Sequence, residues 1–285
     1  MTSTPRFQGQ STLSELFLVV YVSVDDYLKA SARAGHFTLP QADNQKGSYA
    51  ELMTIALVGE LSSQSHVGNW FGFVKVEYAV LFPRLPHRTR YYRVMKQLER
   101  IWADVALRFA GADRLHVIDS KPLPACQDAR WRRPRAMTEA TSGRCRTGFF
   151  YGFKLHAVVD QRGLICRVAL TPANEHDVTV ARALLHGSDA LVVGDKGYAG
   201  ASTWCSGLRA LSYGCTVYAQ PKDNARHPRV WTPALAWLRK STESVFSSLL
   251  RSRHLLTTRL ISFWSIRASV CRKVAAHNLA WFLTH

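Results

Sequence analysis

Short apolar strands that alternate with helices, beginning near residue 111, constrain the fold of this chain most strongly. Runs rich in β-branched and aromatic residues cover 114–118, 151–160, 164–170, 190–193 and 215–219. Apolar residues at helical spacing occupy 177–185, 202–211, 233–250 and 260–283. Three strands with a hairpin-like turn at 161–163, followed by alternating helices and strands, predict an α/β domain with a mixed five-stranded sheet flanked by helices.

The first 110 residues lack this alternation and are predicted to be helical. Apolar residues recur with a helical period between Leu13 and Val24, over 49–61 after an N-cap at Ser48, and over 90–109. At 285 residues the chain has room for two domains. We therefore expect a helical region over 1–110 and the sheet domain over 111–285.

The charge of the chain predicts an anionic partner. The formal net charge is +17 at pH 7 with a pI near 10.0, and most of this excess lies after residue 110. Such a field favours nucleic acid first and an anionic membrane surface second. No run of about 18 apolar residues and no signal peptide is present, so we expect no membrane partner. The six cysteines are scattered, which is typical of reduced thiols in a cytoplasmic protein.

Two groups of basic residues are candidate phosphate contacts. One group lies between the first two predicted strands, in a segment near 127–148 that we expect to be a basic loop because it has little apolar content. It either contacts DNA or is a flexible basic tail. The other group lies on the polar face of the helix over 90–109, which either contacts phosphates or is simply solvated. The candidates are Arg130, Arg132, Arg133, Arg135, Arg144, Arg146, Arg93 and Lys96.

Three carboxylates occupy positions suited to metal binding. Asp119 and Asp195 each follow an apolar strand, and Glu243 lies in a helix among basic residues. Carboxylates at strand ends in α/β sheets line the crevice where ligands bind. Mg²⁺ prefers oxygen ligands, and a pair of such ions about 3.5–4 Å apart promotes phosphoryl transfer. The three acids therefore predict a two-metal site facing a phosphodiester backbone.

Each acid also has a structural interpretation. Asp119 and Asp195 could each fill a turn position, and Glu243 could pair on the helix surface with Arg239, Lys240 or Ser247. The segment Glu175-His176-Asp177 also has two interpretations. Asp177 is either a helix N-cap with a structural role, or the segment lies next to the catalytic cleft. Lys154 and His156 alternate along a strand, and we expect His156 to be a satisfied histidine of the sheet.

The order Asp119, Asp195, Glu243 resembles the DDE transposases of bacterial insertion sequences, which have a ribonuclease-H-like fold. The similarity is closest to insertion-sequence family 982 and extends over nearly the whole chain. It is carried by the segments Tyr21-Val22-Ser23-Val24-Asp25-Asp26-Tyr27-Leu28, Leu81-Phe82-Pro83-Arg84-Leu85-Pro86, Val117-Ile118-Asp119-Ser120-Lys121-Pro122, Tyr151-Gly152-Phe153-Lys154-Leu155-His156 and Gly194-Asp195-Lys196-Gly197-Tyr198, and by the Glu243 helix.

The resemblance implies roles for single residues. Asp119 would bridge two Mg²⁺ ions, for which Mn²⁺ would substitute, while Asp195 would bind one ion and Glu243 the other. Lys196 and Tyr198 would lie beside the scissile phosphate. Arg251, eight residues after Glu243, would share its helix face and contact DNA. Related families place a basic residue seven positions after the glutamate, where this chain has Leu250.

The resemblance also implies a function. It is that of a DNA transposase that cuts at transposon ends and transfers the freed 3′ hydroxyl into target DNA. The helical region over 1–110 would bind the terminal repeats. Because two ends must be held together, a homodimer on DNA is expected, associated with the bacterial nucleoid. Two alternatives stay open, a nuclease of the same fold that cuts without joining and a non-catalytic DNA-binding protein left by a decayed element.

Overall fold

The structure is a computed structural model that describes residues 12–39, 46–107, 113–125, 137–145, 147–185, 191–199, 216–221, 230–255 and 262–284. The chain forms two compact units, Met1–Arg108 with Leu249–Arg259 and Trp264–His285, and Phe109–Ser248 with Leu260–Phe263. The division after residue 108 lies beside the expected boundary. The expected extent of the sheet domain to residue 285 is wrong, because the C-terminal helix packs with the N-terminal helices.

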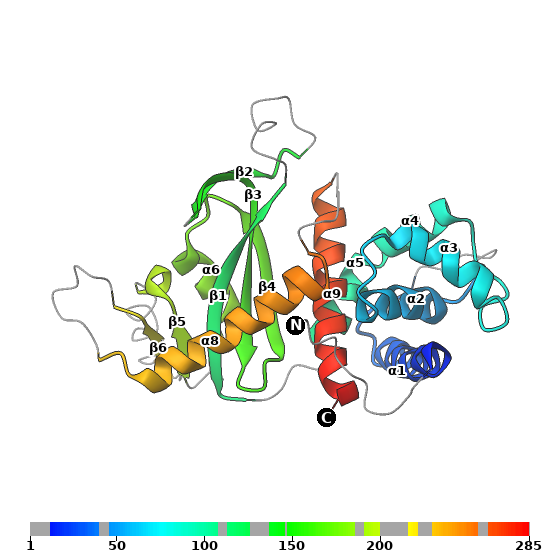
Figure 1. Ribbon diagram of the computed structural model, residues 1–285, viewed down its shortest axis with the longest axis horizontal. Coiled ribbons are helices and arrows are strands. Elements are labelled where there is room, and N and C mark those ends of the chain that lie inside the picture. Colours follow the sequence, from blue (N-terminus) through cyan, green and yellow to red (C-terminus); the bar gives the residue numbers. More distant parts are fainter. Residues whose placement is uncertain are drawn as a thin grey trace. The chain divides into compact units, whose positions relative to one another are not determined.

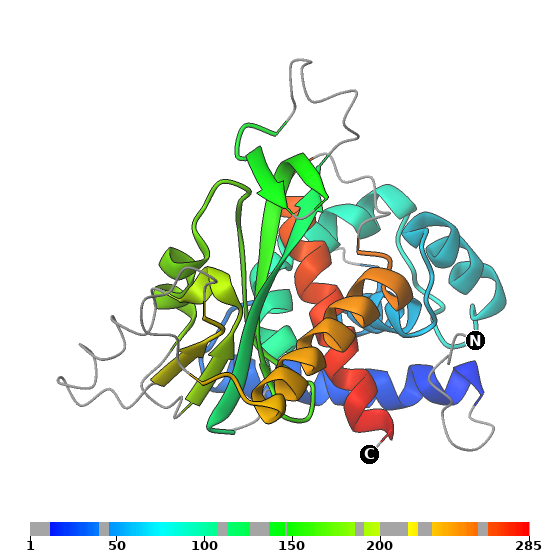
Figure 2. The same cartoon turned by 60° about the vertical axis from the view of Figure 1, so that its left-hand side comes forward.

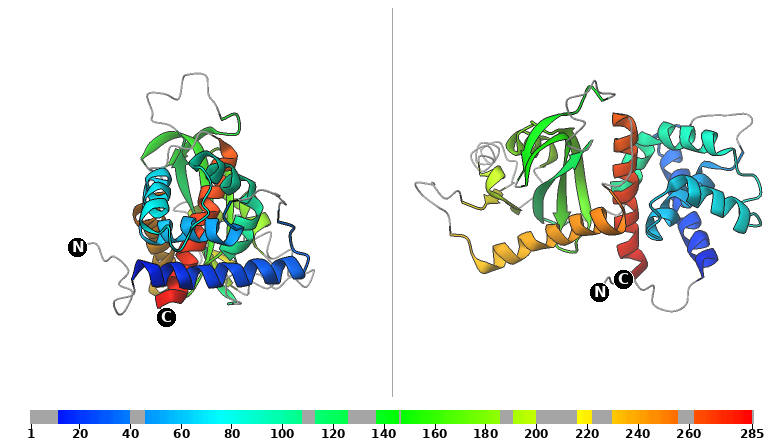
Figure 3. Two further views of the ribbon diagram at one scale, coloured as in Figure 1. Left: turned by 90° about the vertical axis from the view of Figure 1, so that its right-hand side faces the viewer. Right: turned by 45° about the horizontal axis from the view of Figure 1, so that its top comes forward.

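The first unit is helical. Its helices are α1 (Leu13–Arg33), α2 (Tyr49–Leu61), α3 (Val67–Glu77), α4 (Arg88–Gln97), α5 (Glu99–Leu107) and most of α9 (Phe263–Thr284). Figure 3 shows α1 as a long straight helix. The predicted N-cap Ser48 is confirmed, since it accepts a hydrogen bond from the Glu51 amide in a reciprocal capping box. The helix predicted over 90–109 is two helices that meet at Leu98, and α3 was not predicted.

A buried charge cluster lies in the core of this helical unit. Glu60 of α2 accepts hydrogen bonds from Arg272 Nε at 2.7 Å and from Lys273 Nζ at 2.8 Å, both on α9. Arg253 donates to the Glu60 carbonyl oxygen, and all four side chains are buried. Burial alone would raise the pKa of Glu60, but the two cations outweigh it and the pKa is lowered. These contacts explain why α9 belongs to the helical unit.

The second unit contains a mixed sheet of six strands in the described residues, where we had predicted five. The strands are β1 (Leu115–Pro124), β2 (Thr141–Cys145), β3 (Gly148–Asp160), β4 (Ile165–Pro172), β5 (Leu191–Gly194) and β6 (Thr216–Ala219). Their order is β2-β3-β1-β5-β6, with β4 also paired to β3. The pairs β1–β5 and β5–β6 are parallel, and the others are antiparallel. Figure 2 shows the long strands β1 and β3 side by side.

Among the residues that the structure describes, a helix packs on each face of this sheet (Figure 1). On one face, Ile118 of β1 packs with Val180 of α6 (Asp177–Leu184) and with Tyr198. On the other face, Val117 and Val193 pack against Leu238 of α8 (Pro233–Ser247). Because neighbouring residues of a strand point to opposite faces, Asp119 belongs to the α8 face and Ser120 to the α6 face.

Several element bounds differ from those predicted. β1 continues past Asp119 to Pro124, because β3 pairs with it along this whole stretch, from His116 opposite Asp160 to Pro124 opposite Gly152. The extra strand β2 lies in the segment expected to be a loop, and pairs with β3 through its backbone. The helix predicted over 202–211 lies outside the described residues. Within the described part of the chain, no helix has the length and hydropathy needed to cross a membrane.

Candidate active site

Asp119 and Asp195 meet where two parallel strands separate. Ile118 of β1 lies opposite Gly194, the last residue of β5, so the two acids follow directly on neighbouring strands. Asp119 accepts a hydrogen bond from the Ser120 amide, and Asp195 accepts one from the Gly197 amide, each at 2.8 Å. The two carboxylates are therefore brought together as predicted, although Asp119 lies inside β1 and not at its end, and Asp195 also caps the turn that follows β5.

The environment of both acids disfavours their charge. Burial and the neighbouring charge of Asp195 raise the pKa of Asp119 to about 6, against the Ser120 amide bond that lowers it. Burial also raises the pKa of Asp195, with a further contribution from the nearby Asp177 carboxylate. A cation placed between these acids would relieve both effects.

Glu243 does not join the two aspartates. Its Oε1 accepts from Arg239 Nη2 at 3.0 Å, one turn earlier on α8, and its side chain is 53% exposed. The surface pairing of Glu243 with Arg239 is therefore what the structure contains. Arg239 also acts on the aspartates, because its positive charge lowers the pKa of both Asp119 and Asp195. Sequence reasoning named Arg239 only as a helix neighbour of Glu243.

The donor set fits a hard divalent cation in part. The carboxylates of Asp119 and Asp195 are half-buried and repel each other. Such a pair suits Mg²⁺, which takes one or two carboxylates and completes its shell with phosphate oxygens and water. The described residues contain no group of three or more His, Cys, Asp or Glu side chains arranged to hold a metal ion. The described residues thus bring two carboxylates together, while the carboxylate of Glu243 is paired with Arg239.

A second charged group approaches Asp195 from the α6 face. Lys154 Nζ of β3 lies 2.9 Å from Asp177 Oδ1 at the start of α6 and also donates to the Glu175 carbonyl oxygen. Asp177 is the first residue of α6 and not its N-cap, which is His176, so the expected capping role is wrong. The other interpretation of Asp177, a place beside the cleft, agrees with its effect on the pKa of Asp195.

His156 and Tyr198 form a buried polar contact under this group. His156 Nδ1 lies 3.5 Å from the Tyr198 hydroxyl, and Nε2 lies 3.0 Å from the Thr171 hydroxyl, so His156 is a satisfied sheet histidine as expected. Tyr198 is fully buried in the core on the α6 face. The expectation that Tyr198 contacts DNA does not fit this burial, because its ring has no surface to offer.

Two glycines let the turn after β5 fit closely. An ideal Cβ on Gly197 would lie 2.8 Å from Asp177 Oδ2 and 3.0 Å from Asp195 Oδ1. A Cβ on Gly194 would lie 3.1 Å from the Tyr198 Cβ and 3.2 Å from Ile118 Cγ2. Both spaces are tighter than ordinary carbon contacts. The glycines of Gly194-Asp195-Lys196-Gly197-Tyr198 therefore allow Asp177, Asp195 and Tyr198 to approach the same turn.

The predicted DNA contacts have different outcomes. Arg93 and Lys96 are exposed on α4, and Lys196 is partly exposed in the turn after Asp195. Arg144 belongs to β2 and not to a loop, with its guanidinium 5.8 Å from the centre of the Phe149 ring. The remaining predicted contacts of the basic segment, Arg130, Arg132, Arg133, Arg135 and Arg146, lie outside the described residues.

Arg251 is exposed, but the helix that carries it differs from the expected one. We had assumed one uninterrupted α-helix through Glu243, Ser247 and Arg251. Instead α8 ends at Ser247, and Ser248–Ser252 form a π-helical segment. Because a π-helix turns less per residue than an α-helix, the segment changes the angle between Glu243 and Arg251, and their shared face stays a prediction.

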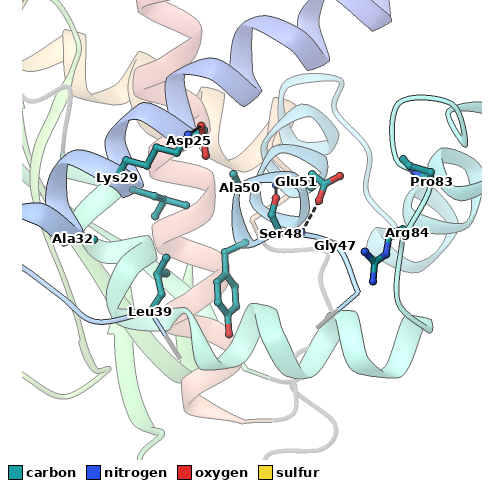
Figure 4. A pocket seen from close by; sticks show the side chains of 12 residues that line it. Asp25, Lys29, Ala32, Leu39, Gly47, Ser48, Ala50, Glu51, Pro83 and Arg84 are labelled. Atoms are coloured by element: carbon teal, nitrogen blue, oxygen red, sulfur yellow. Dashed lines mark hydrogen bonds and ion pairs between the residues drawn. The ribbon is translucent and has the colours of Figure 1, made fainter. Parts of the chain in front are cut away.

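A separate cavity of about 620 Å³ lies in the helical unit (Figure 4). Among its lining residues, Asp25 pairs with Lys29 at 2.6 Å, and Glu51 belongs to the capping box with Ser48. Both acids are thus used within their own helices. The cavity therefore offers no pair of free carboxylates comparable to Asp119 and Asp195.

Comparison with known proteins gives one match. A family model described as a transposase DDE domain matches residues 109–261, which is more than half of the chain and includes Asp119, Asp195 and Glu243. No curated protein and no solved structure matches.

Proposed function

This chain belongs to the transposase DDE domain family, and from that premise we propose that it cuts DNA at transposon ends and joins the freed 3′ hydroxyl to target DNA. The observation that carries the proposal is that Asp119 and Asp195 lie side by side, directly after the last paired residues of β1 and β5, inside the matched region. The segments that resemble insertion-sequence family 982 lead us to propose that the chain is a member of that family.

The acids have separate tasks in this proposal. Asp119 and Asp195 would hold the divalent cations, two Mg²⁺ or Mn²⁺ ions, and Glu243 would supply the third carboxylate once its ion pair with Arg239 is broken. Such ions supply the positive charge that activates an attacking oxygen and stabilises a leaving one. A single set of ligands serves both steps, because water and then a 3′ hydroxyl attack a phosphodiester in the same geometry.

Basic residues near these acids and elsewhere in the chain hold the DNA. Arg239 is released when Glu243 turns away, and its guanidinium is then able to bind a backbone phosphate. Lys196 follows Asp195 directly and lies where it can contact a neighbouring phosphate. Arg93 and Lys96 on α4 and the arginines of the basic segment supply sequence-independent attraction. A homodimer on DNA brings two ends together.

A cleavage and joining assay tests this function. The substrate is a labelled duplex that carries an end of the DNA element encoding the chain, mixed with a target plasmid. We expect nicking at the end and then joined product with Mg²⁺, and neither with EDTA or with Asp195→Asn. The matched control is Asp113→Asn, since Asp113 lies before β1 and only approaches Arg162, at 3.7 Å.

The possible results separate the alternatives. Cleavage without joining would replace the transposase by a nuclease of the same fold. Binding without metal-dependent cleavage would favour the decayed DNA-binding protein. Equal loss of activity in Asp113→Asn and Asp195→Asn would remove the assigned role of Asp195.

A further inference from the structure

Lys154 and Asp177 form an ion pair beside the candidate metal ligands that the proposed function does not use. Their side chains are only 16% and 22% exposed, and Nζ lies 2.9 Å from Oδ1. Lys154 also donates to the Glu175 carbonyl oxygen, and the Ser120 hydroxyl lies 3.4 Å from Asp177 Oδ1. The pair is therefore fixed by groups from β1, β3 and the segment before α6.

The two oxygens of Asp177 face different partners. Oδ1 faces Lys154, Ser120 and, at 3.9 Å, His156 Nδ1. Oδ2 faces the turn at Gly197, and Asp195 Oδ1 faces the same turn. A Cβ added to Gly197 would lie within 3.0 Å of both oxygens. Asp177 thus stands between the Lys154 ammonium and the Asp195 carboxylate.

The ammonium is close enough to act on Asp195. Its charge lowers the pKa of Asp195, while the Asp177 carboxylate raises it. Burial lowers the pKa of His156 to about 4, so this side chain is neutral near pH 7 and adds no second positive charge beside Asp177. A partly buried ammonium that loses its carboxylate is strongly driven to find another.

We propose that Asp177 is a positioning residue that holds the Lys154 ammonium away from Asp195, so that Asp195 stays free to bind a divalent cation. This inference rests on the proposed function, because it takes Asp195 as a metal ligand. Without Asp177, Lys154 turns to Asp195, and the resulting ion pair competes with the cation for the same oxygens.

Binding of Mn²⁺ alone to the full chain, followed by electron paramagnetic resonance, tests this inference. We expect Asp177→Asn to weaken Mn²⁺ binding about 10- to 100-fold, as is common when a group that orients a metal ligand is removed. We expect the double variant Asp177→Asn with Lys154→Gln to return to within about 3-fold of the unmodified chain, because the competing cation is gone. A pair that only braces β3 against α6 predicts the opposite, a double variant at least as weak as the single one.

Lys154→Gln alone gives a second measurement that does not depend on the folding of Asp177→Asn. If Asp177 holds Lys154 away from Asp195, removal of the ammonium leaves Mn²⁺ binding as tight as in the unmodified chain or tighter. A weaker binding of this variant would overturn the inference.

Asp119→Asn and Asp195→Asn separate this inference from the proposed function. If the unmodified chain binds no Mn²⁺, or if these two variants bind it as well as the unmodified chain, the proposed metal site itself fails. If both variants lose Mn²⁺ while Asp177→Asn binds it normally, only the role of Asp177 fails.

Discussion

Asp119 keeps a carboxylate where burial favours the neutral acid. Its pKa is raised to about 6, first by burial and then by the charge of Asp195, although the Ser120 amide opposes the shift. In the unfolded chain an aspartate titrates near pH 4. Folding therefore favours the protonated acid, and this contribution to stability is present at low pH and is lost as the pH rises to about 6.

Asp119→Asn should stabilise the metal-free chain at neutral pH. The amide has no charge to bury, so we expect the free energy of unfolding at pH 7.5 to rise by about 1–3 kcal/mol. The gain should shrink towards pH 4, where the acid is already protonated. Urea unfolding at both pH values measures it, with Asp113→Asn as the control for removing a carboxylate. A gain of equal size at both pH values would contradict the explanation by charge burial.

Individual site residues differed in how far the sequence could place them. The proximity of Asp119 and Asp195 could be predicted from the sequence. Each follows the apolar run of a strand, and adjacent parallel strands bring such positions together. Asp177 and Lys154 meet only through the packing of α6 next to β3, which no local pattern encodes. The resemblance placed Tyr198 beside the scissile phosphate, whereas its ring fills the core. A signal for Asp177 existed in the pair of glycines at 194 and 197, which indicates a close approach.

At the scale of elements, helices α2 and α3 respond to added bulk in opposite ways. Gly59 of α2 faces Trp70 of α3, and an added Cβ would lie 2.6 Å from Trp70 Nε1. That indole nitrogen donates to the Ile55 carbonyl oxygen at 2.7 Å. Gly72 of α3 has no heavy atom within 4 Å of such a Cβ. Gly59 thus permits the packing of α2 against α3, whereas Gly72 only lowers the helix propensity of α3.

Gly59→Ala and Gly72→Ala should therefore change stability with opposite signs. We expect Gly59→Ala to lower the free energy of unfolding by about 1–3 kcal/mol, because the indole must move and strain its hydrogen bond. Gly72→Ala should raise it by about 0.5–1 kcal/mol through the better helix propensity of alanine. Thermal and urea unfolding of the two variants decide the matter, and a shift of the same sign in both would refute the packing argument.

The elements that the sequence predicted are those with strong local patterns. The apolar runs of β3, β4, β5 and β6 and the capped helix α2 were found with bounds close to those observed. β2 has no apolar alternation and exists because the backbone of β3 offers it hydrogen bonds. The extension of β1 through Pro122 likewise depends on β3, since a proline would by itself argue against a strand. The end of α8 in a π-helical segment has no recognisable signal.

At the scale of the whole molecule, buried charge joins distant parts of the sequence. Glu60 of α2 is held by Arg272 and Lys273 of α9, and Arg253 adds a bond to its carbonyl oxygen. Three cations surround one carboxylate in the core of the helical unit. The sequence could not reveal this cluster, because about 200 residues separate the partners.

Glu60→Gln should be among the most destabilising single changes in the helical unit. It leaves buried cations without a counter-charge, and we expect a loss of about 3–5 kcal/mol in the free energy of unfolding. Glu77→Gln, at an exposed position at the end of α3, should stay within about 0.5 kcal/mol of the unmodified chain. Urea unfolding compares the two. A loss below about 1 kcal/mol for Glu60→Gln would show that the cluster tolerates neutralisation of its acid.

The grouping of α9 with helices α1 to α5 also sets an order of events during protein synthesis. A ribosome makes α2 early, then the entire sheet unit, and only afterwards the helix that carries Arg272 and Lys273. Until then the carboxylate of Glu60 has none of its α9 partners, and the apolar residues that α9 covers stay open to other chains. The helical unit therefore completes its buried charge cluster only after the sheet unit has been synthesised.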